Sequence, residues 1–575
     1  MEEKNGQIRR RIIVVKKKKP AAEANRGGIG MFDEYIRKSG LESKTYQREG
    51  VEFCLRREAV ASAGGGVVRG GIIADEMGLG KTIVMMGLIL ANLAAYRRTL
   101  IVVPVALIAQ WVAQIKRTII DTGVKPDLTV FVFHGSAGKR RVVLKMTRDG
   151  IEWWPRPPKT AAGSGRAIDI VITTYGCVAM EEPAAAPKKK APAPAPTATP
   201  SLLTFCANRV IFDEAHHMRN KNSRIFKGAM RVVTAAATGS SRPSVWIVTG
   251  TPIQNKISDL KSLCYVLGFG MCDLISEEKR RMIRNEYVLR RTKVSVGMVA
   301  DSEATAAADS EATADVTCAP RLQSLKHYKS QVPWGSETEL ALSREIHHQA
   351  RNTSDRAERL KLYTRMRQMC VWPALLGAPE TESSSSSYGL SIEEYKAGVS
   401  KQSKIDRVIA TMAAEAATTA VDRKSLVFCH YRREMTQLRD MLLRDGVVAS
   451  EDDVAIIDGR VTARERERIL AAAPKVLILQ IRTCSEGLNL QSYSNVYFVS
   501  PHWNPCVEDQ AIARCYRMGQ TSQVRVFRFY MTDFVGEFDA VIAGETESIS
   551  TLDHKCEEIQ ERKRVLCNEF LCGGV

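Results

Sequence analysis

Short apolar runs, rich in β-branched residues, alternate along the chain with longer segments of helical periodicity. Five of these runs lie in the N-terminal half, at residues 70–74, 100–104, 169–174, 209–213 and 245–249. Five more lie in the C-terminal half, at residues 425–429, 454–458, 475–479, 495–499 and 524–529. Apolar runs separated by helix-length segments are typical of parallel sheets that are covered by helices on both faces. The pattern therefore predicts an α/β protein with two lobes, each built on a mostly parallel sheet.

Three segments interrupt this pattern. Residues 1–30 are basic and Gly-rich and predict a flexible arm, whose Arg and Lys clusters serve nuclear import, phosphate contact or no specific purpose. Residues 181–200 are rich in Pro, Ala and Lys and predict an extended surface insertion, and a duplicated DSEATA within residues 301–314 predicts a loop. The expected organisation is an arm (1–30), a first lobe (31–292), a linker with an insertion (293–354), a second lobe (355–546) and a helical tail (547–575).

Composition narrows the class of partner. The 575 residues are enough for three or four domains at about 100–200 residues each. Lys and Arg total 83 against 64 Asp and Glu, and the net charge of +19 favours a polyanionic partner such as nucleic acid. The 14 Cys are scattered without any C-x-x-C pair, which argues against a zinc module and for a reducing compartment. Because no apolar stretch reaches about 18 residues, we expect no membrane span and a soluble intracellular protein.

The sharpest chemical signal is a Gly-rich segment between the run at 70–74 and a helical stretch. Glycines let backbone amides approach phosphates, a helix N-terminus favours an anion, Lys reaches the outer phosphates, and a Thr hydroxyl can ligate magnesium. The segment departs from the strict P-loop pattern because an Asp stands at the position of the first Gly. The predicted nucleotide-binding residues are Asp75, Glu76, Met77, Gly78, Leu79, Gly80, Lys81 and Thr82.

Two acids complete the predicted nucleotide site. Asp213 and Glu214 end the apolar run at 209–213, where a carboxylate can hold magnesium beside a bound nucleotide while its neighbour activates the attacking water. We assign Asp213, with Thr82, to the metal and Glu214 to the base. Together with Lys81, these acids predict hydrolysis of a nucleoside triphosphate.

The order of motifs resembles that of Swi/Snf-related DNA-dependent ATPases of helicase superfamily two. The resemblance runs from about Leu41 to Phe529 and rests on the blocks DEMGLGKT, LIVVPVALIAQW, DIVITTYG, DEAHHMRNKNS, TGTPIQN, VLRRTK, YTRMRQMCVWP, SLVFCHYRREM, IDGRVTARERE, EGLNLQ, PHWNPCVEDQAIARCYRMGQ and VRVFRF. It implies tandem RecA-like lobes that bind ATP and Mg²⁺ between them. In one departure, Cys484, Ser485 and Glu486 precede Gly487 where the family often has consecutive Gly.

The resemblance also implies roles for single residues. Gln47 resembles the family's adenine-reading glutamine, with a turn residue as the alternative. Arg514 and Arg517 are spaced to share one helical face and resemble arginine fingers that reach a γ-phosphate, and Gln520 belongs to the same predicted catalytic block.

Two further groups resemble elements that couple the lobes or contact DNA. Thr249, Gly250 and Thr251 resemble a relay between γ-phosphate loss and the tracking surface, with a simple strand-to-helix turn as the alternative. The residues that resemble DNA contacts are Gln110, Trp111, Asn489 and Trp503, although both tryptophans also fit the core.

The sequence thus predicts an ATP-dependent motor that tracks along double-stranded DNA. Nucleosomes or another DNA-bound protein are possible further partners, and the roles that fit are chromatin remodelling, transcription regulation and DNA repair. The expected location is the nucleus, or a viral replication site if a virus encodes the chain. A DEAH-type RNA helicase and a non-catalytic DNA-binding scaffold are the alternatives.

Overall fold

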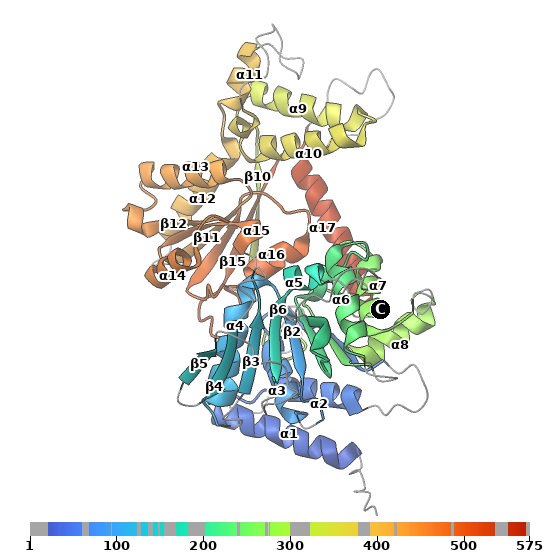
Figure 1. The fold of residues 1–575 in the computed structure, drawn as a ribbon. Coiled ribbons are helices and arrows are strands. Elements are labelled where there is room, and N and C mark those ends of the chain that lie inside the picture. Colours follow the sequence, from blue (N-terminus) through green and yellow to red (C-terminus); the bar gives the residue numbers. More distant parts are fainter. Residues whose placement is uncertain are drawn as a thin grey trace, which may run out of the picture.

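The structure has two α/β lobes, one above the other in Figure 1. It is a computed structural model, and it describes residues 21–59, 68–93, 95–123, 128–135, 142–147, 150–154, 168–181, 202–237, 242–270, 274, 276–299, 322–377, 392–418, 423–484, 488–534 and 550–570. None of the helices in these segments is long and apolar enough to cross a membrane.

The sheet of the first lobe has nine strands in the order β5-β4-β3-β6-β2-β7-β8-β1-β9. All neighbours are parallel except the antiparallel pairs β3-β4 and β4-β5. The five apolar runs of the N-terminal half form β1, β2, β6, β7 and β8, which confirms the predicted parallel sheet. The strands are β1 (Gly70–Ile73), β2 (Thr99–Val103), β3 (Leu128–Phe133), β4 (Val142–Thr147), β5 (Gly150–Trp154), β6 (Ile170–Thr174), β7 (Arg209–Asp213), β8 (Ser244–Val248) and β9 (Val288–Leu289).

Helices cover both faces of this sheet because successive strand residues point to opposite sides. Ile72 and Phe212 pack in one core, with helices α5 (Tyr175–Met180), α6 (Arg224–Ala235), α7 (Ile257–Leu267) and α8 (Glu277–Tyr287). Their neighbours Ile73 and Ile211 pack in a second core, with α1 (Ala21–Lys38), α2 (Thr45–Ala59), α3 (Lys81–Ala91) and α4 (Ile108–Ile115). Two buried faces explain why these strands are continuously apolar.

The second lobe has a six-stranded sheet in the order β10-β15-β14-β11-β13-β12, with all neighbours parallel. The five apolar runs of the C-terminal half form the last five of its strands. These elements are β10 (Lys326–Val332), β11 (Lys424–Cys429), β12 (Val454–Ile457), β13 (Val476–Gln480), β14 (Tyr493–Phe498) and β15 (Arg525–Met531). The helices after the first lobe are α9 (Glu337–Asn352), α10 (Arg356–Val371), α11 (Ile392–Val399), α12 (Ser403–Thr418), α13 (Arg432–Arg444), α14 (Ala463–Ala472), α15 (Ile481–Cys484), α16 (Pro505–Ile512) and α17 (Leu552–Asn568).

Two expected boundaries are wrong. Strand β10 pairs with β15 over residues 326–332, so the second sheet begins inside the segment expected to be a linker. This edge strand, KHYKSQV, is largely exposed and polar and therefore lacks an apolar run. Helix α1 begins at Ala21, inside the expected arm, because Phe32 and Tyr35 on one face are buried against the first lobe. The rest of the arm, nearly all of the insertion at 181–200 and the DSEATA repeat lie outside the described residues.

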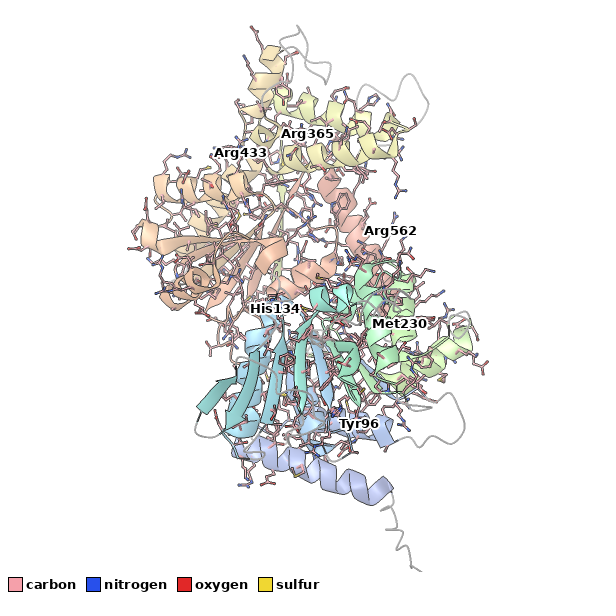
Figure 2. The ribbon with its side chains drawn as sticks, in the orientation of Figure 1. Tyr96, His134, Met230, Arg365, Arg433 and Arg562 are labelled. Carbon is pink, nitrogen blue, oxygen red and sulfur yellow. The ribbon has the colours of Figure 1, made fainter. Side chains whose placement is uncertain are left out.

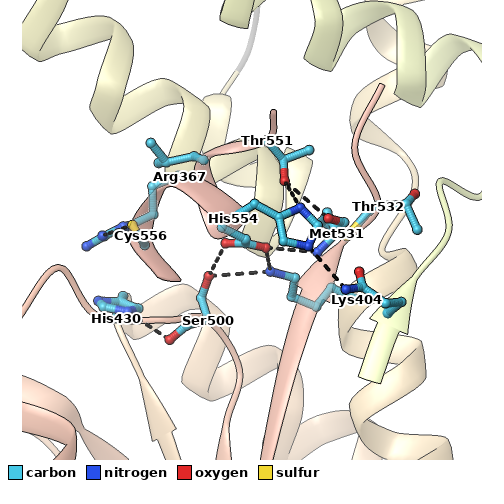
Figure 3. A network of polar contacts seen from close by, with 12 residues as sticks. Arg367, Lys404, His430, Ser500, Met531, Thr532, Thr551, His554 and Cys556 are labelled. Atoms are coloured by element: carbon cyan, nitrogen blue, oxygen red, sulfur yellow. Dashed lines mark hydrogen bonds and ion pairs between the residues drawn. The ribbon is translucent and has the colours of Figure 1, made fainter. Parts of the chain in front are cut away.

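The C-terminal helix α17 contacts both lobes (Figure 1). Its first residue, Leu552, packs in the core of the second lobe, whereas Phe570, just after the helix, packs in the core of the first lobe. The start of the helix is anchored by a buried ion pair between Asp553 and Lys404, and Lys404 is labelled in the polar network of Figure 3. Ser500 Oγ joins this pair by donating to Asp553 Oδ1 over 3.0 Å. The expected C-terminal tail is thus a helix that connects the two lobes.

Candidate nucleotide site between the lobes

The predicted site lies at the carboxyl edge of the first sheet, which faces the second lobe. Figure 2 shows this polarity, because His134, just after β3, lies at the edge near the second lobe and Tyr96, just before β2, lies at the far end. Ligands of open α/β sheets bind at this carboxyl edge.

The Gly-rich loop joins β1 to the N-terminus of α3. Gly78 and Gly80 have φ values of 91° and 79°, a left-handed conformation that favours Gly. A Cβ added at Gly80 would lie 2.4 Å from Nε2 of Gln47, so a larger residue there would displace the Gln47 amide in addition to straining the backbone. Leu79 is fully buried and anchors the loop in the lobe. Lys81 and Thr82 are the first two residues of α3, with their side chains partly exposed at the helix N-terminus.

Gln47 supports this loop directly. Its side chain is buried, and Nε2 donates to the carbonyl oxygen of Leu79 over 3.2 Å. Gln47 lies in α2, so the alternative of a turn residue is wrong. The adenine-reading role stays a prediction.

The carboxylates of Asp75 and Glu76 are bound by residues that follow β9. Asp75 forms a buried ion pair with Arg291, whose Nε donates to Oδ1 over 3.0 Å. Glu76 accepts from the backbone N–H of Lys293 over 2.8 Å. Both carboxylates therefore bind the segment that follows β9 and support the loop. Contact of this part of the loop with a nucleotide, through its backbone amides, stays a prediction.

Lys81, Asp213 at the end of β7 and Glu214 just after it form one electrostatic group. Nζ of Lys81 donates to the carbonyl oxygen of Asp75 over 3.0 Å. Burial lowers the pKa of Lys81, against the opposing charges of Glu214, Asp75 and Asp213. Burial raises the pKa of Asp213 to about 6, and the adjacent charge of Glu214 adds to this shift.

Glu214 occupies a strained position after β7, with φ at 48°. Its Oε2 is buried and accepts no hydrogen bond from the described residues, and Nδ1 of His216 lies 3.3 Å away. Burial alone raises the pKa of Glu214, but His216 and the positive charges of Lys81 and Arg514 outweigh burial and lower it. A buried, charged carboxylate with a free acceptor suits a base that orients water.

The second lobe brings two arginines to this site. Helix α16 ends at Ile512, so the expectation that Arg514 and Arg517 share a helical face is wrong, and both lie in the turns that follow. Proline begins the helix and Gly519, with φ at 90°, shapes the turns after it. Arg514 is close enough to Glu214 to lower its pKa. A Cβ added at Gly78 would lie 3.6 Å from Cβ of Arg517, so the arginine turn contacts the Gly-rich loop.

Gln520 holds the arginine turn in place. Its Nε2 donates to the carbonyl oxygens of Gln491 and Tyr493 over 2.9 and 3.0 Å. Its Oε1 accepts from the backbone N–H of Ser522 over 2.9 Å. Since both ends of the amide are bound to backbone, these contacts support a positioning role for Gln520, and its catalytic role stays a prediction.

The predicted coupling residues connect the Gly-rich loop to the second lobe. A Cβ added at Gly250 would lie 3.4 Å from Nζ of Lys81. Thr249 is buried, and its Oγ1 accepts from the backbone N–H of Thr251 over 3.2 Å. Oγ1 of Thr251 accepts from Gln254 over 3.3 Å, and Gln254 in turn accepts from Asn504 of the second lobe over 3.3 Å. The motif TGTPIQN alone predicts no role for Gln254, and its partner Asn504 in the second lobe reveals one.

The four predicted DNA contacts are placed differently. Gln110 and Asn489 are exposed, which suits surface contact. Trp111 is only 1% exposed, and its Nε1 donates to Oδ2 of Asp213 over 2.8 Å, so its prediction as a DNA contact is wrong. Trp503 is partly buried, with the guanidinium of Arg367 over its ring at 4.8 Å. Gly487 lies outside the described residues.

These features fit a bound polyphosphate. Glycines hold the loop open in front of a helix N-terminus, Lys81 stands at that helix, and a Cβ at Gly250 would press on Cγ of Met77 in the loop at 3.0 Å. The free acceptor of Glu214 is buried beside them. No group of His, Cys, Asp and Glu side chains that could hold a metal unaided occurs in the described segments.

The fold and the site define a protein with two tandem nucleotide-binding lobes of RecA-like type. A sequence model of the SNF2-related domain matches residues 46–278, and one of the helicase conserved C-terminal domain matches residues 401–519. Together they match more than half of the chain, which belongs to the Swi/Snf-related family of helicase-like ATPases.

Three relatives illustrate the range of this family. The chain is 24% identical to the probable global transactivator of Orgyia pseudotsugata multicapsid polyhedrosis virus, over 85% of this chain and 86% of that protein. It is 24% identical to the SWI/SNF-related matrix-associated actin-dependent regulator of chromatin subfamily A member 1 of Homo sapiens, over 81% of this chain and 40% of that protein. It is 22% identical to DNA repair protein RAD5 of Eremothecium gossypii, over 87% of this chain and 58% of that protein.

Among solved structures, the chain is similar to the Sulfolobus solfataricus SWI2/SNF2 ATPase core in complex with dsDNA. The match has a TM-score of 0.32 and 19% identity and covers 93% of this chain and 98% of the other. The chain thus spans 86% of the viral relative, 58% of the repair relative and 40% of the chromatin relative.

Proposed function

We propose that the chain is an ATP-dependent motor that moves along double-stranded DNA. The observation that carries the proposal is that charged residues of both lobes face one another. Lys81 and Glu214 lie in the first lobe, and Arg514 and Arg517 approach them from the second. A site assembled from both lobes links hydrolysis to lobe movement, because loss of the γ-phosphate removes a charge that both lobes hold. Family membership supports this assignment.

The residues divide the chemistry among them. Lys81 and the amides at the start of α3 bind the phosphates of ATP, and Glu214 accepts a hydrogen bond from the attacking water. Thr82 and Asp213 would hold Mg²⁺, which when bound would neutralise phosphate charge. Arg514 and Arg517 stabilise the negative charge of the transition state from the opposite lobe. Trp111 keeps Asp213 oriented by occupying one of its oxygens.

Double-stranded DNA is the proposed track, with nucleosomes or another DNA-bound protein as the cargo. The chain carries a net charge of +19, and relatives bear names that refer to chromatin, DNA repair and transactivation. We infer a role in chromatin remodelling, transcription regulation or DNA repair, in the nucleus or at a viral replication site. Exposed Gln110 and Asn489 are the first candidates for DNA contact.

Parallel ATPase assays test the proposal. Duplex DNA, nucleosomes, forked DNA and RNA are added separately to the wild-type protein and to Glu214→Gln. We expect stimulation of the wild type by duplex DNA, and loss of turnover with ATP binding retained in Glu214→Gln. Lys81→Ala is the matched variant that weakens ATP binding itself. Stimulation by RNA alone would favour an RNA helicase, and no hydrolysis under any condition would favour a scaffold.

A further inference from the structure

Lys293 is a lysine buried between the two lobes. It belongs to the segment after β9, which runs beside the Gly-rich loop, and the carbonyl oxygen of Arg291 in this segment accepts from the backbone N–H of Glu76 over 2.8 Å. Only 4% of Lys293 is exposed. Lysine is rarely buried to this extent unless its charge is paired, so the surroundings of its ammonium group indicate what it does.

Glu76 of the Gly-rich loop contacts both the backbone N–H and the ammonium group of Lys293. Its Oε2 accepts from the backbone N–H of Lys293 over 2.8 Å, and its Oε1 lies 3.3 Å from Nζ. A Cβ added at Gly78 would lie 3.5 Å from Cε of Lys293, so the side chain passes directly along the loop. The first lobe therefore fixes both the origin and the direction of this side chain.

The same ammonium group binds the second lobe. Nζ donates to the carbonyl oxygen of Tyr516 over 3.1 Å and lies 4.3 Å from the centre of its ring. Tyr516 stands between Arg514 and Arg517 in the arginine turn. Since a carboxylate, a carbonyl oxygen and an aromatic face surround Nζ, this ammonium contacts the support of the site and not the phosphate position.

We propose that Lys293 is a positioning residue that docks the arginine turn on the Gly-rich loop. The inference rests on the proposed function, since it assigns a purpose to the arginines of that site. Docking holds Arg517 against Gly78 and Arg514 near Glu214, the arrangement in which both arginines serve the transition state. Lys293 thus selects the closed arrangement of the lobes in which hydrolysis occurs.

Lys293→Met tests this role, because Met keeps the length of the side chain and removes its charge and donor. We expect kcat for DNA-stimulated ATP hydrolysis to fall about 10- to 100-fold, because this is the effect of losing one hydrogen bond to a charged group. The KM for ATP should change less than about threefold, because Lys293 does not contact the nucleotide. Lys329→Met is the matched control. Lys293 and Lys329 both line a cavity between the lobes, but the side chain of Lys329 is 63% exposed, so this variant should retain wild-type kcat.

A double variant separates positioning from a general loss of stability. If Lys293 acts through the arginine turn, Lys293→Met should add little to the loss already caused by Arg517→Ala. Wild-type kcat in Lys293→Met, or losses that multiply in the double variant, would overturn the proposal. If Lys293→Met does not fold, Tyr516→Leu is the second variant, because it removes the aromatic face that contacts Lys293. It should lower kcat by a smaller factor, and an unchanged kcat would again refute the positioning role of Lys293. A wild-type protein without DNA-stimulated hydrolysis would instead refute the proposed function.

Discussion

Replacing Trp111 by Phe tests how the magnesium-binding acid is supported. The indole Nε1 donates to Oδ2 of Asp213 over 2.8 Å, while the backbone N–H of Glu214 donates to Oδ1 over 3.0 Å. Phe keeps an aromatic ring in α4 but removes the only donor of this side chain. Oδ2 then has one partner fewer in a site where Asp213 is only 7% exposed.

The expected cost follows from this geometry. A buried hydrogen bond to a charged group contributes about 1.5–3 kcal/mol. If the whole loss appears in the transition state, kcat/KM for ATP falls about 10- to 100-fold, since 1.36 kcal/mol corresponds to tenfold. DNA affinity should change less than about twofold, because Trp111 is 1% exposed.

Two measurements on each variant distinguish a loss of ATP hydrolysis from a loss of DNA binding. Steady-state ATPase rates give kcat/KM, and a salt titration of duplex binding gives the affinity and its salt slope. Gln110→Ala is the matched control because Gln110 is adjacent and exposed, and it should weaken DNA binding without changing the rate of hydrolysis in the absence of DNA. Weaker DNA binding by Trp111→Phe with unchanged hydrolysis would refute our correction and return Trp111 to the DNA contacts.

Three further predictions concern stability and the insertion. Lys404→Met should lower the free energy of unfolding of the second lobe by about 3–5 kcal/mol in chemical denaturation, because it leaves Asp553 buried without its partner, and a loss under 1 kcal/mol would contradict this. Burial lowers the pKa of His347 to about 4 in the folded protein, whereas its unfolded pKa is about 6.5. The contribution of neutral His347 to the free energy of unfolding is therefore complete above about pH 6.5 and is lost as the pH falls toward about 4. His347→Gln should therefore flatten the decrease in melting temperature between pH 6.5 and 4, and an unchanged decrease would exclude this residue as its cause. Deleting residues 183–199 should leave soluble expression and basal ATPase almost unchanged, and insoluble protein would show that the insertion packs on the lobe.

The sequence predicted those parts of the fold that are buried on both faces. All ten apolar runs are strands because a parallel strand covered by helices must be continuously apolar. Strand β10 escaped prediction because it is a polar edge strand, and β3, which reads LTVFVF, was not among the predicted runs. Periodicity also placed Arg514 and Arg517 on a helix, whereas the backbone leaves the helix at Ile512.

The Gly-rich loop and the acids were predictable because each is local in the sequence. The residues that support the loop and the acids were not predictable, because they act on partners that only the fold brings close to them. Trp111 and Asp213 are 102 residues apart, and Lys293 and Tyr516 are 223 residues apart. The sequence around Trp111 gives no sign that the N–H of this helical residue reaches Asp213 at the end of β7.

The most direct test of the central claim is a strand-displacement assay on a DNA triplex. A motor that moves along a duplex removes a third strand from its path, whereas a protein that only binds DNA does not. We predict that the wild-type protein displaces the third strand when ATP is present and that Glu214→Gln, which retains ATP binding, does not. Hydrolysis that duplex DNA stimulates without any displacement of the third strand would contradict movement along DNA.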